Sequence, residues 1–198
     1  MGKFVLRMKS LLRQRKLFLT ILILLSISVV VLAVVFAINE PSEVYEVNLT
    51  NIAYIQYLSG ESGVFAAIVK MMLSLLIFIA LILVCGIKKL LFPMSVLFYL
   101  YFVYSQIFVL MNIMFFYGFA NCLILLLLLV VYTLLNCFLF ILILLELSAC
   151  CGKCGCFGGL FKISESNILL YLILILLISV LFCLVLLVLK SFVILLVF

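Results

Sequence analysis

The sequence predicts an all-α, polytopic bundle of about five transmembrane helices, with the N-terminus inside and the C-terminus outside. Three observations support this fold class. The chain has 198 residues, of which 72% are hydrophobic and 9% charged, whereas soluble domains are about half apolar and about a quarter charged. Its apolar residues form long runs, and a bilayer core of about 30 Å takes roughly 20 helical residues per crossing. Its cations gather at the ends of these runs.

The spans are predicted from apolar runs bounded by charges, prolines and glycines. The cation-rich residues 1–16 precede the uncharged run 17–38. This run is longer than the apolar region of a signal peptide, which has about 7–15 residues, so an uncleaved first helix is preferred over a cleaved signal. The whole chain, 1–198, is therefore expected to be a single integral membrane domain in the cell membrane. Its spans are 17–38, 64–85, 91–114, 121–147 and 168–189.

The two ends of the chain carry expectations of their own. The basic leader has apolar Phe4, Leu11 and Leu12 beside its cations, so it is expected to lie along an anionic lipid surface. At the other end, Lys190 interrupts the apolar run, and the eight residues after it are too short to cross again. We expect residues 190–198 to lie in the interface or to re-enter the bilayer.

The orientation follows from the cations, because cytoplasmic loops of membrane proteins carry an excess of Lys and Arg. With the N-terminus inside, ten of the 12 Lys and Arg residues fall on the cytoplasmic side. Only Lys70 and Lys190 fall outside. The loop 39–63 then faces outward, and the Cys-rich loop 148–167 faces the cytoplasm. The net charge of +6 therefore reports orientation, and no nucleic-acid partner is expected.

Half of the eight cysteines lie in the stretch SACCGKCGC of the predicted cytoplasmic loop. Thiols usually stay reduced in the cytoplasm, which argues against disulfides. The C-x-x-C spacing with two further thiols could hold zinc, but structural zinc sites usually join ligand pairs from different parts of a fold. Thiol modification is a second alternative, and a plain turn of small residues is preferred. No cofactor is predicted, and the metal-ligand candidates are Cys150, Cys151, Cys154 and Cys156.

An enzyme is not expected. Catalysis needs a nucleophile with a base, a carboxylate pair or a metal cage, and the chain has no His and no Asp. Glu146 is the only acidic residue within a hydrophobic segment. Because it lies near the predicted cytoplasmic end of the fourth span, we expect it to be hydrated.

Uncharged polar residues inside the third and fourth spans are the remaining candidates for a site. Ser105 and Asn112 share a face of the third span with Tyr101, and Asn121 and Asn136 share a face of the fourth. Such side chains hydrogen-bond between helices and contribute about 0.6–2 kcal/mol each. Interhelical bonding is preferred over the alternative, a path for a polar substrate.

The order of these parts resembles a known family. An outer loop ending in SGESG at 59–63 is followed by Gly86, Lys88 and Pro93, and then by the turn Phe-Tyr-Gly-Phe at 116–119. This arrangement resembles the stage II sporulation protein M family of bacterial five-span membrane proteins, over about residues 15–190. The chain departs from the family in lacking several glycines and the proline after the fourth segment, where Cys-Cys-Gly stands instead.

The resemblance implies a non-enzymatic function. The family's namesake anchors peptidoglycan-degrading proteins in the membrane while the developing spore is engulfed. The chain is accordingly expected to be a membrane scaffold that docks extracytoplasmic partners, such as cell-wall remodelling proteins in sporulation, with a second copy of itself as a further candidate partner. The alternatives are a membrane subunit of a small-solute transporter and a metal sensor built on the Cys-rich loop. The implied partner-binding residues of the outer loop are Tyr45, Tyr54 and Tyr57.

Overall fold

The structure, a computed structural model, describes residues 9–10, 12–39, 63–87, 90–118, 123–151 and 167–197. Secondary structure within these ranges is helical, with no strand among them. Five of the helices are long and apolar enough to cross a membrane, which confirms the predicted all-α bundle of about five spans. The chain is therefore an integral, multi-pass membrane protein in contact with a lipid bilayer. The five helices are α2 (Lys16–Asn39), α5 (Val64–Ile87), α6 (Phe92–Tyr117), α7 (Leu123–Cys151) and α9 (Ile168–Val197).

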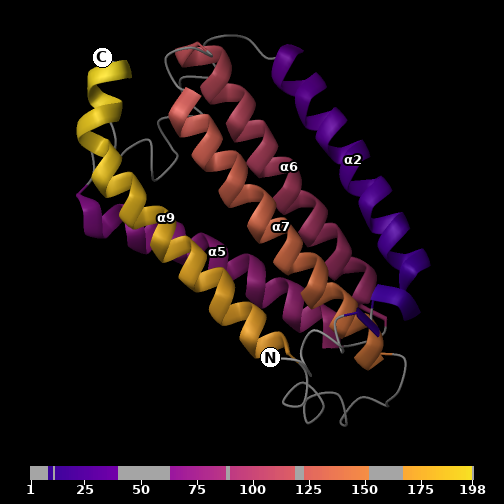
Figure 1. Cartoon of the computed structure of the whole chain (residues 1–198). Helices are drawn as coiled ribbons and strands as arrows, with labels where there is room; N and C mark the ends of the chain where they lie inside the picture. Colours follow the sequence, from indigo (N-terminus) through magenta and orange to yellow (C-terminus); the bar gives the residue numbers. More distant parts are fainter. Residues whose placement is uncertain are drawn as a thin grey trace.

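Successive helices run in opposite directions (Figure 1). Helices α2, α6 and α9 run one way and α5 and α7 the other, so the start of α2 and the end of α9 lie at opposite ends of the bundle. Four described cations, Lys9, Arg13, Arg15 and Lys16, belong to the end where α2 starts. Which end faces the cytoplasm remains a prediction from the charges.

The last helix is longer than the sequence pattern indicates. The predicted fifth span ends at residue 189, but the backbone of α9 continues through Lys190 to Val197, a helix of 30 residues. Lysine has a good helix propensity, so one lysine does not end a helix. A helix of this length extends about 45 Å, which exceeds the bilayer core of about 30 Å. Residues 190–197 therefore prolong the helix instead of forming a separate re-entrant segment.

Helix α7 lies at the centre of the bundle. It contacts α5, α6 and α9, and its apolar span is the most buried of the five. Helix α2 lies at the edge and packs chiefly on α6 (Figure 1). Helix α5 joins the second half of the bundle through α6, α7 and α9.

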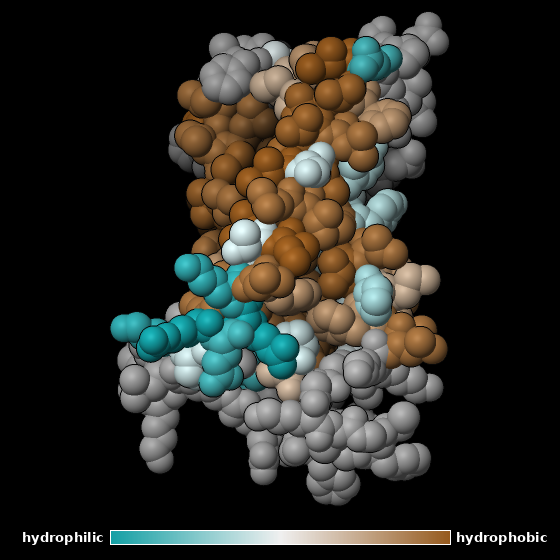
Figure 2. Space-filling model, turned by 90° about the vertical axis from the view of Figure 1, so that its right-hand side faces the viewer, coloured by the Kyte–Doolittle hydropathy of each residue, from teal (hydrophilic) through white to brown (hydrophobic). Residues whose placement is uncertain are grey.

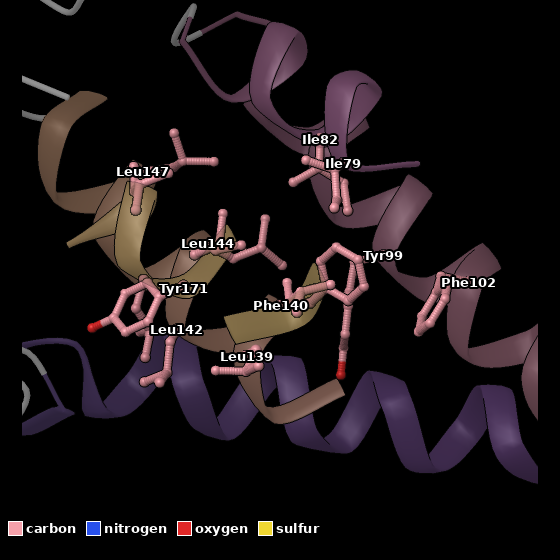
Figure 3. Packing of buried hydrophobic residues seen from close by; sticks show 14 of the residues in the cluster. Ile79, Ile82, Tyr99, Phe102, Leu139, Phe140, Leu142, Leu144, Leu147 and Tyr171 are labelled. Carbon is pink, nitrogen blue, oxygen red and sulfur yellow. The ribbon is translucent and has the colours of Figure 1, made fainter. Parts of the chain in front are cut away.

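The main core joins side chains of all five helices, most of them from α5, α6, α7 and α9 (Figure 3). Aromatic rings contribute much of its volume. The ring of Phe102 on α6 lies 4.9 Å from that of Phe140 on α7 and 5.7 Å from that of Phe78 on α5, measured between centroids. These separations are typical of favourable aromatic pairs. Because lipid tails are as apolar as these side chains, close packing and hydrogen bonds stabilise the contacts, not the hydrophobic effect alone.

The surface of the bundle is apolar along most of its height. Figure 2, which views the molecule from the α2 side, shows a mainly hydrophobic surface with hydrophilic residues gathered toward its lower end. Large exposed apolar side chains of α2 include Leu24, Val31 and Phe36. A soluble protein would not expose such a continuous apolar surface, whereas a lipid-facing helix needs one.

Two helix ends are set by their local sequence. Pro93 lies in the first turn of α6, where its missing N–H costs no hydrogen bond. The same helix ends at Gly118, whose φ of 80° and ψ of 146° form a conformation that is essentially restricted to glycine. The N–H of Gly118 donates to the carbonyl of Met114 at 3.1 Å, which caps the helix and turns the chain away from its axis.

Candidate functional site

The candidate site residues among the described part of the chain are the polar side chains buried between the helices. They belong to three helices, α6, α7 and α9, and are spaced along the length of these helices. Among the described residues, no group of three or more His, Cys, Asp or Glu side chains could hold a metal ion. The buried polar residues are Ser95, Asn112, Thr133, Asn136, Glu146 and Ser179.

Helix α6 is joined to both of its neighbours in the first half of the chain by hydroxyl groups. The hydroxyl of Tyr99 points toward α2 (Figure 3) and lies 3.2 Å from that of Ser26. On another face of α6, the hydroxyl of Ser95 donates to the carbonyl of Ile82 on α5 at 2.9 Å. These two bonds fix the positions of α2 and α5 relative to α6, since few alternative partners exist in hydrocarbon.

Helix α9 is held in a similar way. The hydroxyls of Tyr132 on α7 and Ser179 on α9 lie 3.3 Å apart, and the ring of Tyr132 stacks on that of Phe182 with 4.3 Å between centroids. The thiol of Cys183 donates to the sulfur of Met71 on α5 at 3.9 Å. One helical turn of α9, from Ser179 to Cys183, therefore contacts α7 and α5 at once.

The predicted interhelical residues bond differently from the prediction. Asn112 and Asn136 donate from their amide nitrogens to the carbonyls of Phe108 and Tyr132, four residues earlier in their own helices. Ser105 donates in the same way to Phe102. A side-chain donor can always reach the carbonyl three or four residues before it, whichever way its helix is rotated. These bonds are therefore local, and Asn121 lies outside the described residues.

These local hydrogen bonds use the amide nitrogen of each asparagine and leave the amide oxygen without a described donor. The Oδ1 atoms of Asn112 and Asn136 and the Oγ1 atom of Thr133 are buried and make no hydrogen bond to any described residue. A buried acceptor without a partner costs about 1–3 kcal/mol. These three oxygens are the feature of the bundle interior closest to a binding site for a polar solute, although Asn112 belongs to α6 and the other two to α7.

Glu146 is buried, with 1% of its surface exposed, and the expectation of a hydrated carboxylate was wrong. The reason is that α7 continues for more than a turn beyond it, to Cys151. Its neighbours Leu145 and Leu147 belong to the main core, so the end of α7 is covered by other helices. Close to it, the guanidinium of Arg15 donates to the carbonyl of Ser148 at 3.3 Å.

The hydroxyl pairs that join the helices were not predicted from the sequence. Ser95 and Ser179 each interrupt an apolar run, which is a weak signal, whereas Ser26 and Tyr99 each have another polar residue two positions away. The predicted interhelical residues, Ser105, Asn112, Asn121 and Asn136, were chosen because they share helical faces. A small side chain such as Ser95 also allows two helices to approach closely.

Other predicted residues lie in parts of the chain that the structure does not describe. Cys154 and Cys156 of the Cys-rich loop fall outside the described residues. The backbones of Cys150 and Cys151 form the end of α7, and their side chains are not described. The partner-binding candidates Tyr45, Tyr54 and Tyr57 also fall outside. Metal binding and partner docking at these residues therefore stay predictions.

The arrangement is that of a membrane helix bundle held by single polar contacts. No protein-family model, no curated protein and no solved structure matches the chain.

Proposed function

We propose that the chain is a non-enzymatic scaffold of the cell membrane that holds other membrane or extracytoplasmic proteins in place. The observation that carries the proposal is how the polar groups inside the bundle are used. Each of the pairs Ser26–Tyr99, Ser95–Ile82 and Tyr132–Ser179 joins two helices. Polar side chains that stabilise helix contacts support a role in assembly, because a scaffold needs a fixed surface and no reacting group.

The outer loop is the proposed docking surface. At residues 39–63 it is the longest polar segment of the sequence, and Tyr45, Tyr54 and Tyr57 offer apolar rings with a polar tip. The resemblance to the sporulation protein M family supports cell-wall remodelling proteins as the partners. A second copy of the chain is a further candidate, since large apolar side chains of α2 and α5 are exposed.

The second candidate is a membrane subunit of a small-solute transporter. It is favoured by one observation, the buried oxygens of Asn112, Thr133 and Asn136, which a polar solute could use. Coupled transporters generally bind their substrate near the bilayer midplane, at sites formed by broken helices and ionisable side chains. Helices α6 and α7, which carry these three oxygens, are continuous from Phe92 to Tyr117 and from Leu123 to Cys151, which favours the scaffold.

The test is purification of the full-length protein from its native membrane in a mild detergent, with mass spectrometry of the proteins that accompany it. The scaffold proposal expects extracytoplasmic partners that are lost when residues 43–61 are replaced by a Gly/Ser linker of equal length. The matched control replaces Tyr101, an exposed tyrosine within α6, by phenylalanine and should retain them. A cytoplasmic ATPase that accompanies both variants would contradict the scaffold and support the transporter subunit.

A further inference from the structure

A cluster of cations lies where the chain enters the bundle. Residues 9–10 and 12–14 are helical, and a turn at Arg15 leads into α2. Lys9, Arg13 and Lys16 are exposed, and Arg15 is half-buried. The cluster therefore presents three exposed cationic groups at the end of the bundle where α2 begins.

Two contacts hold this segment against the rest of the protein. Leu12 packs on the main core, and Arg15 reaches across to α7, where its guanidinium donates to the carbonyl of Ser148. Carbonyls in the last turn of a helix have no partner within the helix, and a cation placed there also interacts favourably with the helix dipole. The exposed cations are thus held at a fixed position on the bundle.

The surroundings of the cluster are those of a membrane interface. The next residue, Leu17, is 76% exposed, and Ile21 and Leu24 continue an exposed apolar row along the same face of α2. Figure 2 shows hydrophilic surface bordering hydrophobic surface in this lower part of the molecule. Glu146 is the only acidic residue in the described ranges, and it is buried. Within those ranges no exposed carboxylate neutralises the cluster.

We propose that Lys9, Arg13 and Lys16 bind the phosphate of an anionic phospholipid. Its acyl chains would lie along the apolar row of α2 that begins at Leu17. A phosphate accepts charge-assisted hydrogen bonds from ammonium and guanidinium groups, and basic residues beside a transmembrane helix are attracted to anionic leaflets. The lipid completes the surface of the bundle along α2, which packs chiefly on α6 and carries exposed apolar side chains.

The test uses the full-length protein in detergent, titrated with phosphatidylglycerol or with phosphatidylcholine and observed by native mass spectrometry. The wild type is expected to retain phosphatidylglycerol in preference to phosphatidylcholine. Each cation near an anionic surface contributes about a factor of five, so the triple variant K9Q/R13Q/K16Q should bind it about 100-fold more weakly. The matched control is Lys70→Gln, which removes an exposed cation from α5 and should leave the preference unchanged.

Further arms separate this site from general effects. The conservative variant K9R/K16R keeps the charges and should bind phosphatidylglycerol as the wild type does. This test does not depend on whether the triple variant folds. Inorganic phosphate at the same concentration should not displace the lipid, because it lacks the acyl chains. Equal retention of the two lipids by the wild type, loss of preference in Lys70→Gln, or full competition by inorganic phosphate would each overturn the proposal.

Discussion

Gly86 of α5 lies in close contact with Leu147 of α7. Its replacement by alanine tests how closely the two helices pack. A Cβ atom at residue 86 would lie 2.5 Å from Cδ1 of Leu147, 3.2 Å from Cγ and 3.3 Å from Cδ2. Turning the end of the leucine side chain exchanges one close methyl group for the other. Because Leu147 is 1% exposed and surrounded by core residues, its whole side chain or the helix must move.

The expected cost follows from two opposing effects. Overpacking a well-filled core typically costs about 1–3 kcal/mol. Alanine recovers about 0.5–1 kcal/mol over glycine within a helix. We expect the unfolding free energy of Gly86→Ala to fall by about 1–2 kcal/mol. In the double variant with Leu147→Ala, the new methyl group occupies the emptied space. The double variant should therefore lose less unfolding free energy than the sum of the two single variants, and the difference should be about the overpacking cost.

The assay is reversible unfolding in mixed detergent micelles, followed by circular dichroism. The matched control is Gly63→Ala, because a Cβ there would meet no atom within 4 Å. Its unfolding free energy should change by no more than about 0.5 kcal/mol. A Gly86→Ala variant as stable as the wild type, or additive effects with Leu147→Ala, would show that α5 and α7 do not approach as the structure has them.

Three further variants test the polar contacts and the end of α6. Asn136→Leu removes a buried oxygen without a partner, so we expect stability in micelles to stay level or rise by about 1 kcal/mol; a marked fall would show that the amide has a ligand. Ser179→Ala should lower the free energy of unfolding by about 0.6–2 kcal/mol. Adding Tyr132→Phe to the Ser179→Ala variant should lower it little further, and a double-mutant cycle measures this coupling. Gly118→Ala forces a side chain into a conformation reserved for glycine and should lower the melting temperature in detergent by an amount equivalent to about 1–3 kcal/mol, whereas no shift would mean that the turn can relax.

The sequence alone determined the class of protein and the approximate positions of its five spans. Charge and length settle this, because a bilayer requires about 20 uncharged helical residues per crossing. The same criterion ends the fifth predicted span at residue 189, whereas the helix itself is longer than the span. A charge marks where the apolar run stops, but the backbone of α9 continues through Lys190 because lysine is compatible with a helix.

Only the tertiary structure decided which polar residues join the helices and which are buried. These helices are apolar on every side, so no hydrophobic stripe distinguishes the face toward lipid from the face toward protein. The rotation of each helix is set by packing, which placed Ser26 against Tyr99, Tyr132 against Ser179, and Glu146 in the interior. Hydrogen-bond partners within a membrane thus depend on helix rotation, which an evenly apolar sequence does not encode.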